Sequence, residues 1–488
     1  MAELKEYIVD YLVEKVGDSI WGRGAEASRV DKLVEAQIGR LFERYITGKD
    51  GDKIDRYFLV DEGGILYIFN GSNFERITNE NTLKYLIKLT MEKSNVGAVY
   101  QYNSSKKIAD ECEISIKQEK ECKFIPDRRY AVFSNVVLDI ETGKLSPHSV
   151  KYVTDMVFDF DYDPDKRFPF WEQFVEKTIP DAEMRKAFQQ FCGAFFVNRS
   201  KVKIEHICIL IGSGQNGKSV LAEAIVGMFG GNLVTKYSPE QLFKSSQRDY
   251  ALADVHGKLA NYCDDISNKD FSGGDFKLFT SGAPFQGRHP YGSYFIVTKI
   301  PLMLCCANAM PPTTDDTDGY YRRLLPIMCP NQVADKDKDP LLKDKLATPE
   351  ARVGIFNWLL EGYHELIANN GKIEIGSSIK EVKDTIKAEA NSARRWVKEM
   401  GFVAINPIDA QPSNWKSFAD WMRVYKEYCN EYNESAKSPK AVGLIFKEMG
   451  FASERRANGT WYCVGVKENN EINSEFREIA IPEEELPF

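Results

Sequence analysis

The sequence lacks the cysteine and histidine patterns of a zinc site or a disulfide framework. Its ten cysteines are scattered without a CxxC pair, and only five histidines accompany them. Several cysteines lie in apolar runs such as PLMLCCAN, where a reduced cysteine is an ordinary small core residue. We therefore expect no zinc site and no disulfides, and a cytoplasmic protein of a bacterial cell or of the host of a mobile element.

The sequence also lacks a long apolar run and an excess of positive charge. No segment approaches the length needed to span a bilayer, and the amino terminus reads as a charged amphipathic helix, so we expect no membrane partner. The formal net charge is −8, so any nucleic-acid contact must come from local basic surfaces. A length of 488 residues with 43% hydrophobic residues is enough for about three folded domains.

The most informative stretch is IEHICILIGSGQNGKS. Ile207–Ile211 has the length and composition of a buried strand, and LAEAIVGMF after the glycine-rich loop reads as a helix. A glycine-rich loop between a strand and a helix can aim backbone N–H groups at phosphate, while its lysine reaches the β- and γ-phosphates. The alternative is a glycine turn with an incidental lysine. The predicted ATP-binding residues are Gly212, Ser213, Gly214, Gln215, Asn216, Gly217, Lys218, Ser219 and Val220.

Two further predicted strands end in polar residues. Leu259–Cys263 is followed by Asp264 and Asp265, and Pro301–Ala307 is followed by Asn308. Ligands of a parallel sheet lie beyond the carboxyl ends of its strands, so these side chains should meet the phosphate loop. The two aspartates, with Ser219, are candidate Mg²⁺ ligands and candidate groups for orienting the attacking water, and Asn308 is a candidate γ-phosphate sensor. A lone DD pair is otherwise a common turn.

Two basic features lie around these strands. Arg322 and Arg323 follow an acidic loop, and one of them could reach a neighbouring subunit's nucleotide as an arginine finger, or both could form surface ion pairs. Residues 286–294 read as a hairpin, and basic and aromatic groups there suit a grip on a single-stranded backbone. Its candidate DNA contacts are Arg288, His289, Tyr291 and Lys299.

Taken in order, these motifs resemble the superfamily 3 helicases of phages, plasmids and poxviruses, the helicase half of helicase-primases. The resemblance rests on GSGQNGKS, GKLANYCDD, FKLFTSGAPFQGRHPYG, Asn308 with Met310-Pro311, and DTDGYYRR, and it extends upstream to FSNVVLDIETGKLSPHS and FDYDPDKRFPFWEQF, covering roughly 125–465. It implies an AAA+-like P-loop core, a hexameric ring, ATP with Mg²⁺, and 3′ to 5′ movement on single-stranded DNA with unwinding of forked duplex during replication.

The chain departs from the family pattern at two places. The catalytic acid of the family is commonly glutamate where this chain has Asp265, and SGD is often written where this chain has SGA ending in Ala283. No polymerising primase domain is recognisable, so primer synthesis would fall to a separate partner. Two other functions stay open: an origin-binding initiator that uses ATP only as an assembly switch, and a P-loop kinase for a small metabolite.

The pattern downstream of the ATPase block predicts three helices and a hairpin turning at Asn458-Gly459, which is typical of a winged helix. Its groove helix would be SPKAVGLIFKEMGF, although a winged helix can also serve only for protein docking. Its candidate phosphate contacts are Lys440, Lys447, Arg455 and Arg456. The chain ends in acidic residues and Leu-Pro-Phe488, a tail that either recruits a replication partner or is simply solvated.

The predicted fold class is α/β, with a P-loop core, an α+β amino-terminal region and a carboxyl-terminal winged helix. A primase-like acidic pair is not evident in the amino-terminal region, which reads as a scaffold. The expected domains are a scaffold at 1–125, a helical collar at 126–200, the ATPase at 201–345, a helical linker at 346–385, the winged helix at 386–468 and the acidic tail at 469–488.

Overall fold

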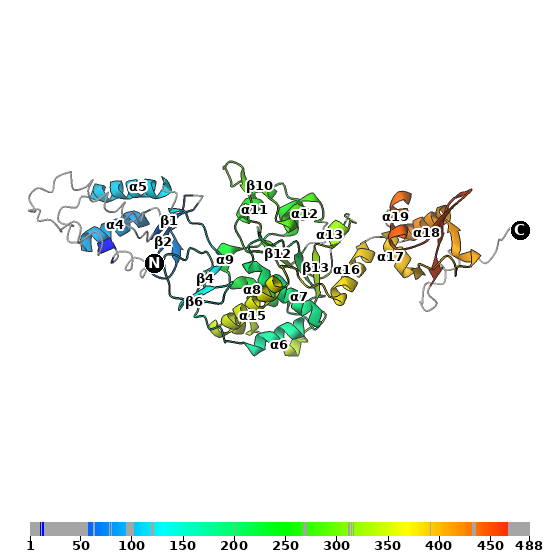
Figure 1. The fold of residues 1–488 in the computed structure, drawn as a ribbon, viewed down its shortest axis with the longest axis horizontal. Helices are drawn as coiled ribbons and strands as arrows, with labels where there is room; N and C mark the ends of the chain where they lie inside the picture. Colours follow the sequence, from blue (N-terminus) through cyan, green and yellow to red (C-terminus); the bar gives the residue numbers. More distant parts are fainter. Residues whose placement is uncertain are drawn as a thin grey trace, which may run out of the picture.

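The computed structural model describes residues 57–61, 64–77, 79, 81–93, 102–118 and 122–466, with short gaps at 200, 267–270, 311–312, 314, 316, 391 and 432–435, and residues 10, 12 and 13 before them. The predicted acidic tail lies outside the described residues. Figure 1 shows a central body around a sheet, with smaller bodies built from the amino-terminal and carboxyl-terminal elements on either side of it. No helix in the described ranges is both long and apolar enough to cross a membrane.

The centre of the molecule is a parallel sheet of five strands in the order β13-β7-β12-β9-β8, which confirms the predicted α/β class. The strands are β7 (Ile207–Ile211), β8 (Val234–Thr235), β9 (Ala260–Cys263), β12 (Leu302–Ala307) and β13 (Leu324–Met328). The predicted bounds of β7 are confirmed, and β9 and β12 each start one residue later than predicted.

The central strands are buried on both faces, which explains why they read as continuous apolar runs. Cys208 and Leu210 of β7 point into one core, whereas Ile207, Ile209 and Ile211 point into another on the opposite face. Alternate residues of a strand face opposite sides, so the two cores follow from the pleat. Both layers of helices around the sheet are therefore needed to bury it.

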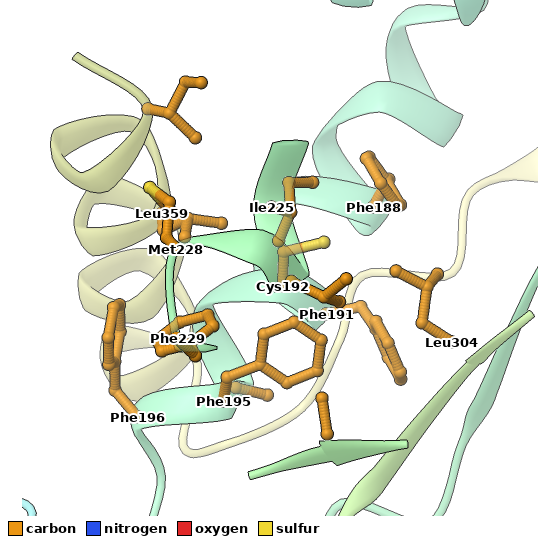
Figure 2. Close-up of a cluster of buried hydrophobic side chains, with 14 of the residues drawn as sticks. Phe188, Phe191, Cys192, Phe195, Phe196, Ile225, Met228, Phe229, Leu304 and Leu359 are labelled. Atoms are coloured by element: carbon orange, nitrogen blue, oxygen red, sulfur yellow. The ribbon is translucent and has the colours of Figure 1, made fainter. Parts of the chain in front are cut away.

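The first of these cores is large and aromatic. It is covered by α6 (Pro169–Thr178), α7 (Ala182–Gly193), η5 (Ala194–Phe196), α8 (Lys218–Gly227), α9 (Gly230–Leu233), α14 (Leu342–Leu346) and α15 (Pro349–Ala368). Figure 2 shows Phe188, Phe191 and Phe195 of the α7 region meeting Ile225, Phe229 and Leu359. The stretch 346–385, expected as a linker, therefore supplies a buried helix, α15, to the central core.

The opposite face of the sheet carries shorter helices and a hairpin. They are α10 (Pro239–Phe243), α11 (Arg248–Asp254), α12 (Gly274–Ser281), α13 (Asp318–Tyr321), α16 (Ser377–Ala390), and the strands β10 (Phe285–Gly287) and β11 (Phe295–Val297), while η6 (Asp335–Asp337) follows β13. Phe276 and Phe279 of α12 and Val297 of β11 are buried with the sheet residues of that face. The β10–β11 hairpin therefore packs against the core that contains Ile207, Ile209 and Ile211.

A buried arginine ties the collar region to the sheet. Arg199 donates hydrogen bonds to the carbonyl oxygens of Ile204 (2.8 Å), Thr280 (2.6 Å), Ile300 (2.9 Å) and Pro301 (3.0 Å). Burial lowers its pKa to about 10, and the charge of Glu205 acts in the opposite direction. One guanidinium thus joins its own segment at 199–204 to Thr280 and to Ile300-Pro301, which are about 80 to 100 positions away.

Small antiparallel sheets flank the central body on its amino-terminal side. One consists of β1 (Phe58–Val60), β2 (Leu66–Phe69) and β3 (Phe74–Arg76), packed with α4 (Thr82–Lys93) and α5 (Tyr102–Gln118). β2 and β3 form a hairpin, in which Phe69 pairs with Phe74 and the Asn70 side chain accepts hydrogen bonds from the amides of Ser72 and Asn73. The other sheet consists of β4 (Tyr130–Val132), β5 (Val137–Asp139) and β6 (Leu145–Ser146), so the predicted helical collar begins with strands.

The carboxyl-terminal body has the helices and the hairpin predicted for a winged helix. They are α17 (Ser392–Glu399), β14 (Phe402–Val403), η7 (Pro412–Asn414), β15 (Trp415–Ser417), α18 (Phe418–Glu431), α19 (Pro439–Glu448), β16 (Ser453–Arg456), β17 (Gly459–Cys463) and β18 (Gly465–Val466). Arg456 pairs with Gly459, so the turn is Ala457-Asn458, one residue earlier than predicted. Trp396, Tyr425 and Phe446 of the three helices form its own core. All ten cysteines of the chain are buried free thiols.

Candidate nucleotide site and DNA-facing surfaces

The glycine-rich loop follows β7 directly and turns through left-handed conformations. Gly214, Gln215 and Gly217 have φ angles of 101°, 55° and 81°, and Gly217 precedes α8. A Cβ atom on Gly212 would lie 2.3 Å from the carbonyl oxygen of Cys329, so only glycine fits there. The loop therefore has the backbone shape that lets N–H groups and a helix amino terminus face an anion.

Lys218 is a buried cation, with 7% of its surface exposed. Its Nζ donates hydrogen bonds to the carbonyl oxygen of Gly212 (2.7 Å) and to Oδ1 of Asn216 (3.0 Å). Within the described ranges it forms no ion pair. The hydrogen bonds of this buried ammonium go to neutral oxygens, and the Asp264 carboxylate acts on it only at longer range. Such a group favours an anionic ligand, because burying a charge without a directly bonded counter-charge costs free energy.

The segment after β13 supports this loop and was not predicted from the sequence. Asn216 Nδ2 donates to the Cys329 carbonyl (2.7 Å), Gln332 Nε2 donates to Ser213 Oγ (2.9 Å), and the Val333 amide donates to the Gln215 carbonyl (2.8 Å). This contact depends on β13 lying beside β7, which the sequence does not reveal. Val220, predicted with the loop, is half-buried and packs on the first core.

Of the two predicted acids, Asp264 lies beside the loop. Its carboxylate accepts hydrogen bonds from the hydroxyl groups of Tyr262 (2.6 Å) and Ser219. Partial burial acts to raise the pKa of Asp264, but those hydrogen bonds and the charges of Lys343 and Lys218 outweigh it, so the pKa is lowered. Ser219 and Asp264 thus offer paired oxygen ligands for a divalent cation.

Tyr262 and Lys343 are further site residues that the sequence analysis missed. Tyr262 precedes Asp264 by two positions on β9, so strand alternation could have pointed to it. Lys343, which pairs with Glu223 (2.6 Å), comes from α14 and carries no comparable signal. Both residues hold the Asp264 carboxylate in its charged form.

Asp265 and Asn308 complete the same edge of the sheet. In the strand register Ala307 lies beside Ile211 and Cys305 beside Cys263, so Asn308 follows at the level of Gly212 and the aspartates lie next to it. Both Asp265 and Asn308 are exposed. The fold therefore brings these residues to the edge that carries the loop.

The two arginines lie at the opposite edge. They precede β13, and Leu324 of β13 pairs with Ile207 at the start of β7, whereas the loop follows Ile211. A strand of five residues is about 16 Å long, so neither arginine lies against the phosphate loop of the same chain.

The two arginine side chains differ sharply in exposure. Arg323 has a side chain only 9% exposed and donates to the Gly319 carbonyl, and burial and the neighbouring Arg322 lower its pKa. The Arg322 side chain is 63% exposed and lies 3.6 Å from Glu205 Oε2. Only Arg322 is placed to reach a second molecule.

His206 lies next to this edge and gives a test of the local packing. Burial, together with the charges of Lys383 and Arg323, lowers its pKa to about 4. The unfolded chain should take up this proton near pH 6.5 and the folded chain only near pH 4, so stability should fall as the pH drops between these values. We expect His206→Gln to remove about 2 kcal/mol of the stability loss between pH 7.5 and 5, measured by chemical unfolding at both pH values. An identical pH dependence in variant and parent would contradict this placement.

The predicted hairpin is present, and its basic residues are not equivalent. The Arg288 guanidinium lies 5.2 Å from the Tyr250 ring centre and 5.1 Å from that of Tyr294, so it is packed against α11. His289 stacks on Phe295, whereas Tyr291 is fully exposed at the tip. Lys299 follows β11 and is exposed at the foot of the hairpin.

The carboxyl-terminal basic residues lie on two surfaces. Lys440 and Lys447 are exposed on α19, with the exposed Leu444 between them. Arg456 pairs with Glu454 and lies 4.3 Å from the Trp461 ring centre, and Arg455 is exposed on the same strand, β16. The lysines and the arginines thus belong to two different elements, α19 and β16.

A parallel sheet whose strand β7 runs through a GSGQNGKS loop into a helix places the chain in the P-loop class of α/β proteins. Residues 210–323, from the phosphate loop to the arginines, match a family of unknown function, DUF5906. Residues 40–180 match the family described as D5 N terminal like, which begins upstream of the residues that carry the sequence resemblance.

The chain is also similar to individual proteins, one of them viral. The chain is 29% identical over 209 residues to a protein of Acanthamoeba polyphaga mimivirus named "Putative helicase"; the match covers 40% of this chain and 21% of the viral protein. With the D5 N terminal like match, it bears out the resemblance to superfamily 3 helicase-primases of viruses and phages. Two apo structures of the NrS-1 C-terminal region are 12% identical to the chain, with TM-scores of 0.46 and 0.45, covering 84% and 83% of this chain and 96% of each of those chains.

Proposed function

We propose that the chain is an ATP-dependent DNA helicase of a phage, plasmid or prophage replication system. The observation that carries the proposal is a buried Lys218, which forms no ion pair with any residue that the structure describes, at one edge of the sheet and an exposed Arg322 at the other. A site built on one edge, with its arginine on the other, is complete only when a second subunit adjoins it. We therefore propose a homo-hexameric ring with ATP bound at each subunit interface.

The residues at the loop fit ATP and Mg²⁺. Lys218 and the loop amides would bind the β- and γ-phosphates, Ser219 and Asp264 would hold Mg²⁺, and Asp265 and Asn308 would orient the attacking water and the γ-phosphate. Bound Mg²⁺ would neutralise phosphate charge during hydrolysis. Asp265 has a shorter side chain than the glutamate common in the family. Asp264 and Asp265 are therefore proposed to share the role of orienting the attacking water.

The DNA contacts are proposed to lie on the hairpin and the carboxyl-terminal body. Tyr291 at the hairpin tip would stack on a base of single-stranded DNA, and His289 and Lys299 would contact its backbone. Lys440, Lys447 and Arg455 would contact duplex phosphates from the winged-helix-like body. A separate primase is the proposed replication partner, and recruitment by the acidic tail stays a prediction.

We expect Tyr291→Ala to lower strand unwinding several-fold while leaving DNA-free ATP hydrolysis unchanged, because stacking on one base contributes about 1–3 kcal/mol. The measurement is unwinding of a forked duplex per ATP hydrolysed. Ser293→Ala, in the same loop, is the matched control. Arg288→Ala is a poorer test, since it also removes the packing on Tyr250. Unchanged coupling in Tyr291→Ala would remove the hairpin tip from the mechanism.

A forked-duplex assay with ATP, run beside a mass measurement of the ATP-bound assembly, tests the function as a whole. ATP-dependent strand separation by a ring of six subunits is the expected result. Rings that bind duplex without separating it would instead support an initiator that uses ATP as an assembly switch. A monomer whose hydrolysis ignores DNA would support a metabolite kinase.

A further inference from the structure

Two neighbouring cavities on the amino-terminal side of the sheet are rich in basic residues, and the first of them has no part in the proposed function. The first, of about 550 Å³, lies on the β4-β5-β6 sheet and is lined by Arg129, Tyr130, Val137, Asp139, Thr142, Lys144, Ser146, Lys151 and Tyr152. The second, of about 480 Å³, lies between that sheet and the central body. Arg129 lines both, so the cavities adjoin.

The positive charge in the first cavity is only partly neutralised. Asp139 accepts two hydrogen bonds from Arg129, at 3.0 and 2.6 Å, and Arg129 in turn lowers the pKa of that carboxyl. Lys144 and Lys151 are exposed and form no ion pair within the described ranges. Two lysines are therefore left to attract an anion.

Hydroxyl and aromatic groups lie among these lysines. Lys151 Nζ is 4.7 Å from the Tyr152 ring centre, and the Tyr152 ring lies edge-on to Tyr130, with 4.8 Å between centres. A hydrogen bond with Ser146 lowers the pKa of Tyr152 despite its burial, with the charges of Lys151 and Lys144 adding to the effect. Lysines beside hydroxyl groups and the half-buried Tyr130 suit a phosphate that carries a base or sugar.

The second cavity continues the basic lining toward the hairpin. Lys201, Lys258 and Lys299 line it together with Arg128 and Arg199, against the acids Asp127 and Glu141. Thr298 and Lys299 of this lining directly follow β11. The lining thus runs from the β4-β5-β6 sheet to the foot of the hairpin.

We propose that the two cavities form one groove for the backbone of single-stranded DNA, with Lys144 and Lys151 as phosphate contacts. A groove of adjoining cavities fits a polymer of phosphates better than a single small anion, because Arg129 links basic groups on both sides. The proposal rests on the proposed DNA-dependent function and adds a second contact region, separate from the hairpin tip.

The test compares the full chain with a variant carrying Lys144→Gln and Lys151→Gln. Binding of labelled oligodeoxythymidine is measured by fluorescence anisotropy over a series of NaCl concentrations. The slope of log K against log salt should become shallower by about 1.4, since each single-strand phosphate contact contributes about 0.7. Lys380→Gln, at an exposed lysine of α16, should keep the parental slope. An unchanged slope in the double variant would overturn the groove.

Two further measurements separate the possible outcomes. Inorganic phosphate, added at the same concentration as the phosphate groups of the oligonucleotide, should not displace the labelled oligodeoxythymidine. Displacement by inorganic phosphate as effective as that by unlabelled oligonucleotide would show a site for free phosphate instead. DNA-free ATP hydrolysis should be the same in the double variant and the parent. If the parent unwinds forked duplex while the salt slope of the double variant equals that of the parent, the groove alone is refuted. If the slope of the double variant is shallower but the parent does not unwind forked duplex, the helicase function alone is refuted.

Discussion

Replacing Lys218 with methionine is expected to reduce ATP hydrolysis by about 10- to 100-fold, because a charge-assisted contact to phosphate, typically worth about 1.5–3 kcal/mol, is lost where charge develops. Methionine has nearly the length of lysine and fills its buried position. The fold of the loop should therefore survive the change. The measurement is steady-state turnover with and without single-stranded DNA, beside a thermal unfolding curve.

Asn216→Ala is the control for the loop. Lys218 Nζ donates to Asn216 Oδ1, and Asn216 Nδ2 in turn holds the Cys329 carbonyl, so this variant loosens the loop while keeping the ammonium. We expect its turnover to lie between those of the parent and Lys218→Met. Turnover of Lys218→Met within twofold of the parent would contradict a phosphate role for this lysine.

Replacing Arg322 with alanine is expected to spare ATP binding and to reduce DNA-stimulated turnover by about 1000-fold, the scale of an arginine supplied to another subunit's nucleotide. The reason is geometric. Arg322 is exposed at the edge opposite its own loop and is held there by Glu205. Nucleotide binding is measured with a fluorescent ATP analogue and turnover with phosphate release.

Mixing two inactive variants gives the sharpest test of this arrangement. In a ring that contains both Lys218→Met and Arg322→Ala subunits, some interfaces pair an intact loop with an intact arginine. Turnover should therefore reappear on mixing. If the mixture stays as inactive as its parts while the same mass of ring forms, the arginine does not act between subunits.

Arg323→Met is the matched control for its neighbour. Arg323 is buried and donates to the Gly319 carbonyl, so its loss should lower the thermal midpoint. Mixing Arg323→Met with Lys218→Met should not restore turnover. The sequence treats the two arginines alike, and their difference in exposure separates them.

The parts of this protein that depend on local pattern can be predicted from the amino-acid sequence. The β7 strand, the loop to Ser219, the β10–β11 hairpin and the element order of the carboxyl-terminal body follow from apolar runs, glycine positions and turn residues. Such signals are carried by neighbouring residues in the chain. They therefore needed no knowledge of what packs against them.

The residues that complete the site are set by long-range packing and are not predictable from local pattern. Strand order places the 329–333 segment against the loop, Lys343 near Asp264, and Arg322 on the opposite edge from Lys218. The packing of helices on the sheet also buries α15 in the core and lets Arg199 donate hydrogen bonds to four carbonyl oxygens. Many of these contacts join residues that are about 80 to 120 positions apart in the sequence. Local periodicity does not predict such pairs, because they are set by how the layers of helices pack on the sheet.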